Sequence, residues 1–250
     1  MTSRRYVTDS GPIHARVGGG AATRTAVVLV HGVIVSSRYL MPLGVELADD
    51  APVLIPDLPG YGLSRGPGGA PTLAALADAV MACARVAGHD RVVLVGNSFG
   101  AQVVVEAALR HPERVARIIL LGPTVDPKAR TLLAQAIRWL RNAPDEHLSV
   151  LPIMLRDLID IGPARAARLL RVMLADRIER KLGDVTCPAL IVRGGRDRVV
   201  PAEWADRAAR LVPLGELAVV EGYAHMAHYS GPLAMAPVIR RFVRAQASAL

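Results

Sequence analysis

The stretch VVLV at residues 92–95, followed directly by GNSFG at 96–100, decides the fold of this chain. The four aliphatic residues predict a buried strand, and the Ala- and Val-rich sequence that continues to Arg110 predicts a helix. A G-x-S-x-G motif between a strand and a helix places its serine on a strained turn, where the two glycines allow close packing. This setting predicts that Ser98 is a nucleophile. The alternative is a glycine-rich turn with an incidental serine.

A serine nucleophile needs a base, and the base needs a group that orients it. Asp197 follows one later predicted strand, within the motif GGRDR, and His225 follows the last predicted strand, within EGYAH. Since the carboxyl ends of parallel strands meet at one edge of a sheet, we expect both side chains beside Ser98. Asp197 could instead pair with a neighbouring arginine at the surface, and Asp126 is the alternative acid.

Two histidines, His225 and His228, lie three residues apart. On a helix this spacing could present both rings to a metal ion, but no further cluster of Cys, His or Asp at ligand spacing accompanies them. We therefore expect neither a metal site nor a cofactor. His225 is the expected base because it follows the strand directly, whereas His228 is expected to begin a helix. Four other histidines are expected to be solvated or structural: His14, His89, His111 and His147.

An oxyanion that forms at the nucleophile requires preorganised hydrogen-bond donors. The backbone N–H of Phe99, directly after Ser98, is the first expected donor. The second is expected in the loop after the first parallel strand, which reads HGV at residues 31–33. Gly32 allows the backbone to turn inward, so the N–H of Val33 is the predicted second donor. A buried His31 is expected to orient this loop.

Short apolar runs alternate with longer Ala- and Leu-rich stretches, which is typical of a mostly parallel sheet with helices on its faces. We expect an α/β fold with eight strands, of which the first two form an antiparallel hairpin at the edge. The predicted strands cover residues 5–8, 13–17, 26–30, 53–55, 92–95, 118–121, 190–192 and 217–220. Helices are predicted at 72–86, 98–110, 201–211 and 232–249.

The alternation stops after Asp126 and resumes after Asp184. Within this interval, helical patterns occur at 131–141, 149–159 and 164–175, and no β-branched run is present. We interpret residues 126–183 as a helical cap or lid, inserted into a single domain that spans residues 1–250.

The composition excludes several classes of protein. The 250 residues are 52% hydrophobic and 21% charged, which is unlike a disordered or fibrous chain. The apolar runs are much shorter than the roughly 20 residues of a membrane-spanning helix, and the N-terminal MTSRRYVTDSG lacks the apolar region of a secretory signal. Cys83 and Cys187 are too few for a disulfide framework, so free thiols and a cytoplasmic location are expected.

The motifs together resemble those of the α/β-hydrolase fold superfamily, in the branch with a serine nucleophile and a small helical cap. The matching pieces cover nearly the whole chain: HG at 31–32, DLPGYGLS at 57–64, GNSFG at 96–100, GGRDRVVP at 194–201 and GYAH at 222–225. Dehalogenases and epoxide hydrolases of this kind carry an aspartate where GNSFG has its serine, so the resemblance argues against both. The fold hosts many reactions, so it does not fix the chemistry by itself.

The resemblance favours a serine hydrolase that acts on an ester or thioester of a small apolar acyl compound. GNSFG also resembles hydrolases that cleave carbon–carbon bonds of ring-cleavage products. Those enzymes usually have a glycine-rich oxyanion loop and a tryptophan after the catalytic histidine, whereas this chain has VIVSS at 33–37 and Met226 after His225. Carbon–carbon bond hydrolysis is therefore the alternative. A non-catalytic ligand-binding module with the same fold is a further one.

The chain has a net charge of +8, with 30 basic residues of which two are lysines. Residues 126–182 carry 11 basic and 7 acidic residues, and Arg165, Arg168 and Arg171 share one helix face. These arginines could attract a carboxylate or phosphate-bearing substrate, but a solvated helix face is the simpler interpretation. Nucleic-acid binding is not expected, because aromatic residues are only 4% and no nucleic-acid motif is present.

Overall fold

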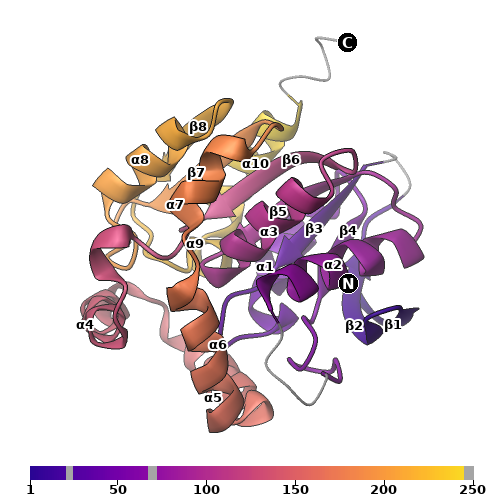
Figure 1. Cartoon of the computed structure of the whole chain (residues 1–250), viewed down its shortest axis with the longest axis horizontal. Coiled ribbons are helices and arrows are strands. Elements are labelled where there is room, and N and C mark those ends of the chain that lie inside the picture. The colour runs from indigo at the N-terminus through magenta and orange to yellow at the C-terminus, as the bar shows by residue number, and fades with distance from the viewer. Residues whose placement is uncertain (21–24, 67–71, 245–250) are drawn as a thin grey trace.

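The computed structural model describes residues 1–20, 25–66 and 72–244, and it contains one sheet flanked by helices (Figure 1). The strand order is β1-β2-β4-β3-β5-β6-β7-β8. β2 pairs antiparallel with β1 and β4, and all other neighbours pair parallel. The predicted α/β fold with a mostly parallel eight-stranded sheet is therefore confirmed. The strands are β1 (Thr2–Thr8), β2 (Gly11–Gly18), β3 (Ala26–Val30), β4 (Val53–Pro56), β5 (Val92–Asn97), β6 (Val115–Leu121), β7 (Ala189–Gly194) and β8 (Gly215–Val220).

The helices alternate with the strands along most of the chain. They are α1 (Met41–Leu47), α2 (Leu73–Val86), α3 (Phe99–Arg110), α4 (Leu132–Asn142), α5 (Leu151–Ile161), α6 (Pro163–Ala175), α7 (Ile178–Lys181), α8 (Ala202–Leu211), α9 (Ala227–Ser230) and α10 (Pro232–Arg244). Short 3-10 helices are η1 (Ser37–Leu40), η2 (Pro127–Ala129), η3 (Ala143–Asp145), η4 (Leu148–Val150) and η5 (Leu182–Asp184). In the described part of the chain, no helix is both long and apolar enough to cross a membrane.

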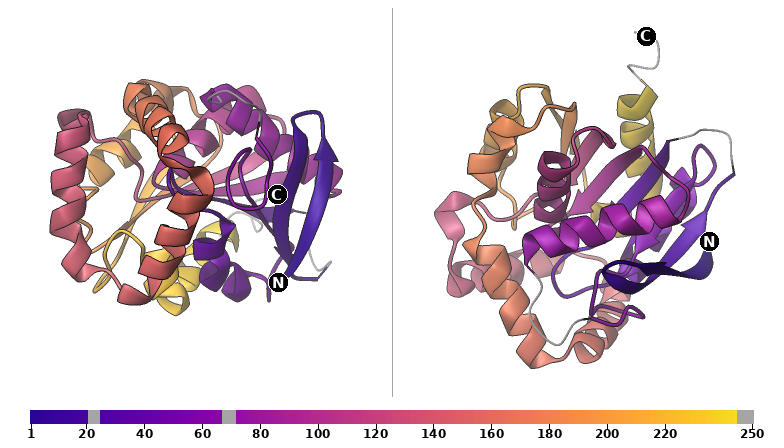
Figure 2. Two further views of the ribbon diagram at one scale, coloured as in Figure 1. Left: turned by 90° about the horizontal axis from the view of Figure 1, so that it is seen from below. Right: turned by 45° about the vertical axis from the view of Figure 1, so that its right-hand side comes forward.

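The central strands separate two apolar layers. Val28 and Val30 pack in a cluster with residues of α2, α3 and α8, whereas Val27 and Leu29 belong to a second cluster with α1 and α10. Successive side chains of a strand point to opposite faces, so an all-apolar strand requires cover on both. The two further views in Figure 2 show helices on either side of the sheet.

Several element boundaries differ from the predictions. Most parallel strands are one to several residues longer than predicted, because strands can continue through residues that the apolar runs do not include. Helix α1 (Met41–Leu47) was not predicted, although Leu40, Leu43 and Leu47 are spaced for one buried helix face. Helix α10 begins as predicted at Pro232, and residues 245–249 of the predicted helix lie outside the described part of the chain.

Strand β8 differs from the central strands because part of it is exposed, although its apolar run resembles theirs. Leu217 and Val219 are exposed, and β8 pairs only with β7 because it ends the sheet. An edge strand has fewer neighbours to cover its faces.

A continuous run of helices connects β6 to β7. We call residues 127–184, from η2 to η5, the helical segment. Its helices α4, α5 and α6 lie at the lower left in Figure 1, to one side of the sheet and its flanking helices. Its three main helices start within two residues of the predicted patterns.

A buried carboxylate, Asp57, ties the loop after β4 to β2 and η1. It is 2% exposed and accepts hydrogen bonds from the ring of His14 (2.8 Å), from Ser37 N–H (2.8 Å) and from Leu63 N–H (2.9 Å). Burial alone would raise the pKa of Asp57, but the hydrogen bond from His14 and the other donors hold it far below its usual value. His14 is therefore structural, as expected, and it lies in β2, within the predicted strand at 13–17.

Asp57→Asn should destabilise the protein by about 3 kcal/mol at pH 7, because buried donors lose a charged acceptor. The folded-state pKa of Asp57 is lowered, so its contribution is complete above about pH 4 and is lost as the pH falls further. Urea unfolding at several pH values should therefore show that the difference in free energy of unfolding between the wild type and Asp57→Asn becomes smaller in acid. Asp9→Asn, at a side chain 89% exposed, is the control. A difference that is constant down to pH 3 would contradict this assignment.

Candidate active site

Ser98 occupies the turn between β5 and α3 with φ 56° and ψ −118°. Among the described non-glycine residues, no other has a positive φ. A Cβ on Gly96 would lie 2.3 Å from the carbonyl oxygen of Gly100, and a Cβ on Gly100 would lie 2.2 Å from that of Val30. Both contacts are impossible for a larger residue. The two glycines of G-x-S-x-G thus permit the close packing that holds Ser98 in its strained conformation.

His225 and Asp197 form a buried pair. Nδ1 of His225 lies 2.8 Å from Oδ2 of Asp197, and both side chains are 1% exposed. Oδ1 of Asp197 accepts the N–H groups of Val199 and Val200, each at 2.8 Å. Since Asp197 accepts at Nδ1, the proton of a neutral His225 ring resides there. Nε2 of His225 is buried and has no hydrogen-bond partner among the described residues, so it is free to accept a proton.

The pKa of His225 reflects two opposing effects. Burial lowers it, while the charge of Asp197 and the hydrogen bond to that carboxylate raise it, and the net result is a raised pKa. A smaller raising contribution comes from Glu146. The site therefore stabilises the imidazolium form, which a general base must adopt after it takes a proton.

Neither the alternative acid, Asp126, nor the alternative ion pair of Asp197 with Arg198 occurs next to His225 in the structure. Asp126 instead accepts a hydrogen bond from Nη2 of Arg138 at 2.6 Å. Arg198, a neighbour with which Asp197 could have paired at the surface, forms an ion pair with Asp145 at 3.0 Å. Asp197 is thus the carboxylate that meets the histidine.

Tyr39 links the loop after β3 to the strand that carries the serine. Its hydroxyl oxygen accepts the N–H of Gly32 (2.7 Å) and its O–H donates to Oδ1 of Asn97 (2.7 Å). Nδ2 of Asn97 donates to the carbonyl of Leu121 in β6 (3.0 Å). No motif in the sequence indicates this role of Tyr39, and only its tertiary position reveals the link.

The two expected oxyanion donors directly follow Gly32 and Ser98 in the sequence. Val33 follows Gly32 in the same loop and lines the pocket at Ser98, and Phe99 begins helix α3. Neither backbone N–H donates to an acceptor within the described residues. Both N–H groups therefore remain available to a bound oxygen.

His31 is buried and orients the same loop, as expected. Its Nε2 accepts the N–H of Leu58 (3.0 Å), and its Nδ1 lies 2.9 Å from the carbonyl oxygen of Gly32. Burial lowers the pKa of His31, which keeps the ring neutral. A neutral ring can accept at Nε2 and donate at Nδ1, so both hydrogen bonds are satisfied.

An Asn142–Glu146 pair in the helical segment holds the two loops that carry the acid and the base. Oδ1 of Asn142 accepts the N–H of Arg198 (3.0 Å), directly after Asp197. Oε1 of Glu146 accepts the N–H of Met226 (3.0 Å), directly after His225, and also Nδ2 of Asn142 (2.7 Å). The sequence does not single out either residue, since a polar pair spaced by four residues is common on helices.

A second carboxylate of the helical segment contacts the loop after β3 and the start of η1. Asp157 of α5 is fully buried, accepts the N–H of Ser36 (2.7 Å) and forms an ion pair with Arg38. Arg38 also pairs with Asp160 at 2.9 Å. The helical segment therefore forms hydrogen bonds to three loops near Ser98: those that contain Asp197, His225 and Ser36.

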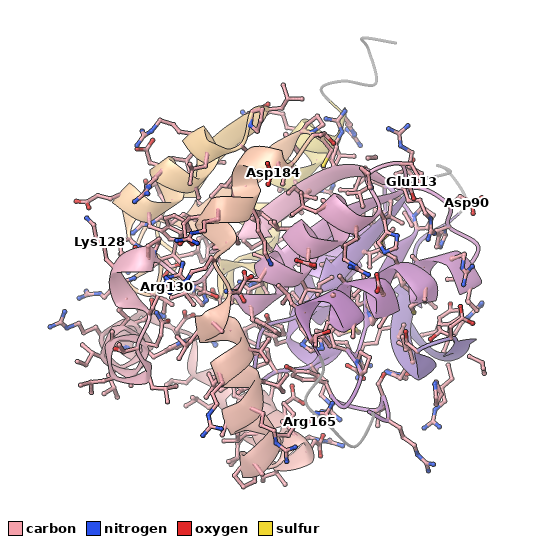
Figure 3. All side chains as sticks on the ribbon, in the orientation of Figure 1. Asp90, Glu113, Lys128, Arg130, Arg165 and Asp184 are labelled. Atoms are coloured by element: carbon pink, nitrogen blue, oxygen red, sulfur yellow. The ribbon has the colours of Figure 1, made fainter. Side chains whose placement is uncertain are left out.

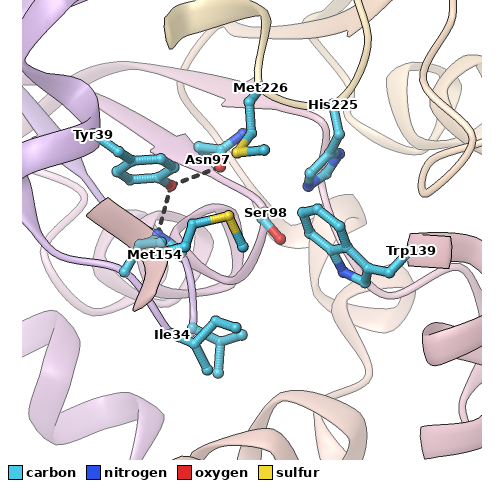
Figure 4. Close-up of a pocket in the computed structure, with 11 residues that line it drawn as sticks. Ile34, Tyr39, Asn97, Ser98, Trp139, Met154, His225 and Met226 are labelled. Atoms are coloured by element: carbon cyan, nitrogen blue, oxygen red, sulfur yellow. Dashed lines mark hydrogen bonds between the residues drawn. The ribbon is translucent and has the colours of Figure 1, made fainter. Parts of the chain in front are cut away.

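These residues surround a mostly apolar pocket (Figure 4). Its empty space, counted out to the mouth, is about 310 Å³. Trp139 of α4 stands edge-on to the ring of His225, with centroids 5.2 Å apart. The described residues that line the pocket are Gly32, Val33, Ile34, Val35, Tyr39, Asn97, Ser98, Trp139, Met154, His225 and Met226.

The arginines singled out in the sequence do not line this pocket. Arg165, labelled beside α5 and α6 in Figure 3, donates to the carbonyl of Pro59 (2.9 Å). Arg168 is exposed and donates to the carbonyl of Ala164 in its own helix (3.3 Å), and Arg171 is exposed as well. The latter two form the solvated face that was the simpler interpretation.

His228 is buried in the protein interior and does not line the pocket at Ser98. It is fully buried, stands edge-on to Tyr39 with centroids 4.6 Å apart, and has no described hydrogen-bond partner at either ring nitrogen. Burial lowers its pKa to about 3, so the ring is neutral. No group of three or more metal-ligating side chains occurs in the described part of the chain.

Glu146→Gln should lower the pKa of His225, because the substitution removes a negative charge that favours the imidazolium. The glutamine oxygen can still accept the N–H of Met226, so the loop should stay in place. Titration of the His225 ring by NMR, assigned with His225→Gln, measures the change. Asp145→Asn removes the neighbouring charge that pairs with Arg198 and is the control. An unchanged or higher pKa in Glu146→Gln would refute the coupling.

The relatives found by sequence are similar to this chain over most of its length. An uncharacterised protein of Mycobacterium tuberculosis is 27% identical over 89% of this chain and 76% of its own length. The 2-hydroxy-6-oxo-2,4-heptadienoate hydrolase of Pseudomonas putida is 27% identical over 80% of this chain and 82% of the relative. The pimeloyl-[acyl-carrier protein] methyl ester esterase of Aromatoleum aromaticum is 26% identical over 88% of this chain and 99% of the relative.

Solved structures share the fold. A thermophilic esterase from Thermogutta terrifontis superposes with a TM-score of 0.79 at 24% identity, covering 98% of this chain and 99% of that chain. E-2-(acetamidomethylene)succinate hydrolase has a TM-score of 0.80 at 25% identity, with 97% and 98% coverage. The family model described as the alpha/beta hydrolase family matches residues 27–238, a range that includes Ser98, Asp197 and His225. Since this match extends from β3 into α10, the chain belongs to the alpha/beta hydrolase family.

Proposed function

We propose that this chain is a serine hydrolase that cleaves an ester or thioester of a small apolar acyl compound. One observation carries the proposal: His225 is bonded to Asp197 through Nδ1, and its unpartnered Nε2 shares a pocket with Ser98. This is the arrangement of nucleophile, base and orienting acid that acyl transfer requires.

The proposed reaction has two halves. In the first, Nε2 of His225 takes the proton of the Ser98 hydroxyl as Oγ attacks the carbonyl carbon, and Asp197 stabilises the imidazolium. The N–H groups of Val33 and Phe99 donate to the tetrahedral oxyanion. His225 then protonates the leaving alcohol or thiol, which leaves an acyl ester on Ser98.

In the second half, His225 takes a proton from water, and the resulting hydroxide attacks the acyl carbon. A second tetrahedral oxyanion forms and accepts the same two N–H groups. When it collapses, the bond to Oγ of Ser98 breaks, Oγ regains the proton from His225, and the carboxylic acid departs. Every step uses groups of this chain together with water.

The lining of the pocket supports an uncharged, apolar acyl group. Ile34, Trp139, Met154 and Met226 line it, and the described lining residues include no arginine or lysine. A carboxylate or phosphate on the bound part of the substrate would there lack a cationic partner. We therefore favour a substrate with an apolar acyl group over the carboxylate- or phosphate-bearing substrate that the arginines of the sequence had suggested.

We further propose that the helical insertion, residues 126–183, acts as the cap of this site within a single domain. Trp139 of α4 and Met154 of α5 form part of the pocket wall, and Asn142, Glu146 and Asp157 bond the surrounding loops. A cap of this kind excludes water and selects the acyl group by shape.

Carbon–carbon bond hydrolysis is the second candidate function. The Pseudomonas putida relative named 2-hydroxy-6-oxo-2,4-heptadienoate hydrolase favours it. The methyl ester esterase of Aromatoleum aromaticum, at nearly the same identity, favours ester cleavage. The absence of a basic side chain among the described lining residues supports the ester, because ring-cleavage products of this type carry a carboxylate.

Ser98→Ala should lower kcat on a cleaved ester by about 10⁵-fold or more, because no other group replaces the nucleophile. A fluorophosphonate probe should label the wild-type protein at Ser98, detected by peptide mass spectrometry, and should not label Ser98→Ala. The panel comprises short p-nitrophenyl esters, acyl thioesters and ring-cleavage products. Ser149→Ala, at an exposed serine of η4, is the matched control.

The outcomes separate the three possibilities. Labelling with turnover of esters or thioesters supports the proposal, whereas labelling with turnover of ring-cleavage products alone establishes the second candidate. A protein that is neither labelled at Ser98 nor active on the panel would be a non-catalytic member of the fold, and the proposal would be rejected.

Tyr39→Phe should reduce kcat/KM by about 10- to 100-fold, because the loop that bears Val33 loses the hydroxyl that fixes Gly32 N–H. Labelling of Ser98 by the probe should persist, since the serine, acid and base are unchanged. Steady-state kinetics with the best ester of the panel measure the loss. Full activity in Tyr39→Phe would show that the link does not position the oxyanion loop.

A further inference from the structure

The outer face of helix α5 is apolar although it is exposed. Leu151, Leu155 and Ile159 recur at a spacing of four residues on that face and are between 55% and 70% exposed. The opposite face holds buried Asp157 and Ile161, so that side packs onto the protein. An apolar helix face that the protein leaves uncovered is a candidate contact surface.

Helix α4 repeats this pattern. Leu133, Ile137 and Leu140 lie at helical i, i+4 and i+7 positions and are between 39% and 74% exposed. Gln135 and Asn142 are buried on the other side of the helix. We give the name outer apolar face to two exposed stripes on consecutive helices of the helical segment: these three residues of α4, and Leu151, Leu155 and Ile159 of α5.

Exposed apolar side chains are concentrated here. Helices α4, η4 and α5 have 11, 3 and 11 residues, yet they hold nine of the seventeen large apolar side chains that are exposed in the described part of the chain. Scattered exposed leucines are ordinary on a protein surface, but such a concentration marks an interaction surface.

The same two helices form walls of the pocket. Trp139 of α4 and Met154 of α5 contact the space around Ser98, on the inner sides of the helices whose outer sides carry the leucines. A partner that covers the outer apolar face would therefore lie directly behind the pocket wall.

The charges on these helices select the chemistry of that partner. Arg141 and Arg156 are exposed next to the leucines, and neither forms an ion pair with any described residue. Two nearby acids are engaged by other arginines: Asp145 pairs with Arg198, and Asp160 shares Arg38 with the buried Asp157. The face thus combines leucines with unpaired positive charge.

A second copy of this chain fits this surface poorly. Each copy carries a net charge of +8, so two outer apolar faces with their arginines would repel each other. An anionic lipid surface offers the opposite charge together with an apolar interior. Leucine on one side and arginine around it is the composition of helices that lie in a membrane interface.

We propose that the outer apolar face binds the surface of an anionic lipid bilayer. The leucine and isoleucine side chains of α4 and α5 enter the boundary between headgroups and acyl chains, and Arg141 and Arg156 meet the phosphates. The helices lie in the plane of the interface and do not cross the bilayer. This binding uses no catalytic group, so it stands whether or not the proposed function is correct.

Sedimentation with vesicles of phosphatidylcholine, with and without phosphatidylglycerol, tests the proposal on the full chain. The wild-type protein should bind vesicles that contain phosphatidylglycerol, and added salt should weaken the binding. The variant Leu151→Gln/Leu155→Gln/Ile159→Gln should bind at least about tenfold more weakly, because it removes three inserting side chains. Arg141→Gln/Arg156→Gln should lose the preference for phosphatidylglycerol.

Leu214→Gln/Leu233→Gln is the matched control, since these leucines are 53% and 74% exposed and lie in the turn before β8 and in α10. It should bind as the wild type does. Ser98→Ala should also bind normally, which separates this test from that of the hydrolase. Urea unfolding checks that each variant is folded. The proposal is overturned if the wild-type protein sediments with neither kind of vesicle. It is also overturned if light scattering shows that the wild type is a dimer and the α5 variant is a monomer.

Discussion

The close approach of β5 and α3 at Ser98 is the constraint on which the site depends. There is no room for a Cβ at Gly96 or Gly100, so only glycine at both positions allows the strand, the turn and the helix to pack this closely around the serine. Ser98 has its positive φ at the end of β5, which lies inside the sheet between β3 and β6. A strained turn persists only where rigid neighbours determine it from several sides.

The groups around this turn are positioned by bonds that cross between distant parts of the chain. Tyr39 joins the loop after β3 to Asn97, and the Asn142–Glu146 pair joins the loop of Asp197 to that of His225. Charged and amide acceptors are used because they satisfy loop N–H groups that a buried loop would otherwise leave unpaired. The helical segment therefore has a structural role at the site in addition to forming its wall.

Much of the fold was predictable because its signals are local. Short apolar runs indicated each parallel strand, and Thr72, which caps α2 through a hydrogen bond from Ala75 N–H, indicated a helix start. The exposed side chains of β8 were not predictable, since a sequence does not state which strand ends the sheet. For the same reason the buried place of His14 beside Asp57 depended on pairing between strands far apart in sequence.

The sequence by itself determined the α/β class, the strained turn and the order of Ser98, Asp197 and His225, because each follows from a motif attached to a strand end. Only the tertiary structure decided which acid meets His225 and which groups hold the loops. It also showed that Leu151 and its neighbours face outward, although apolar spacing alone indicates a buried helix. Periodicity gives the faces of a helix, but the packing of other elements decides which face is covered.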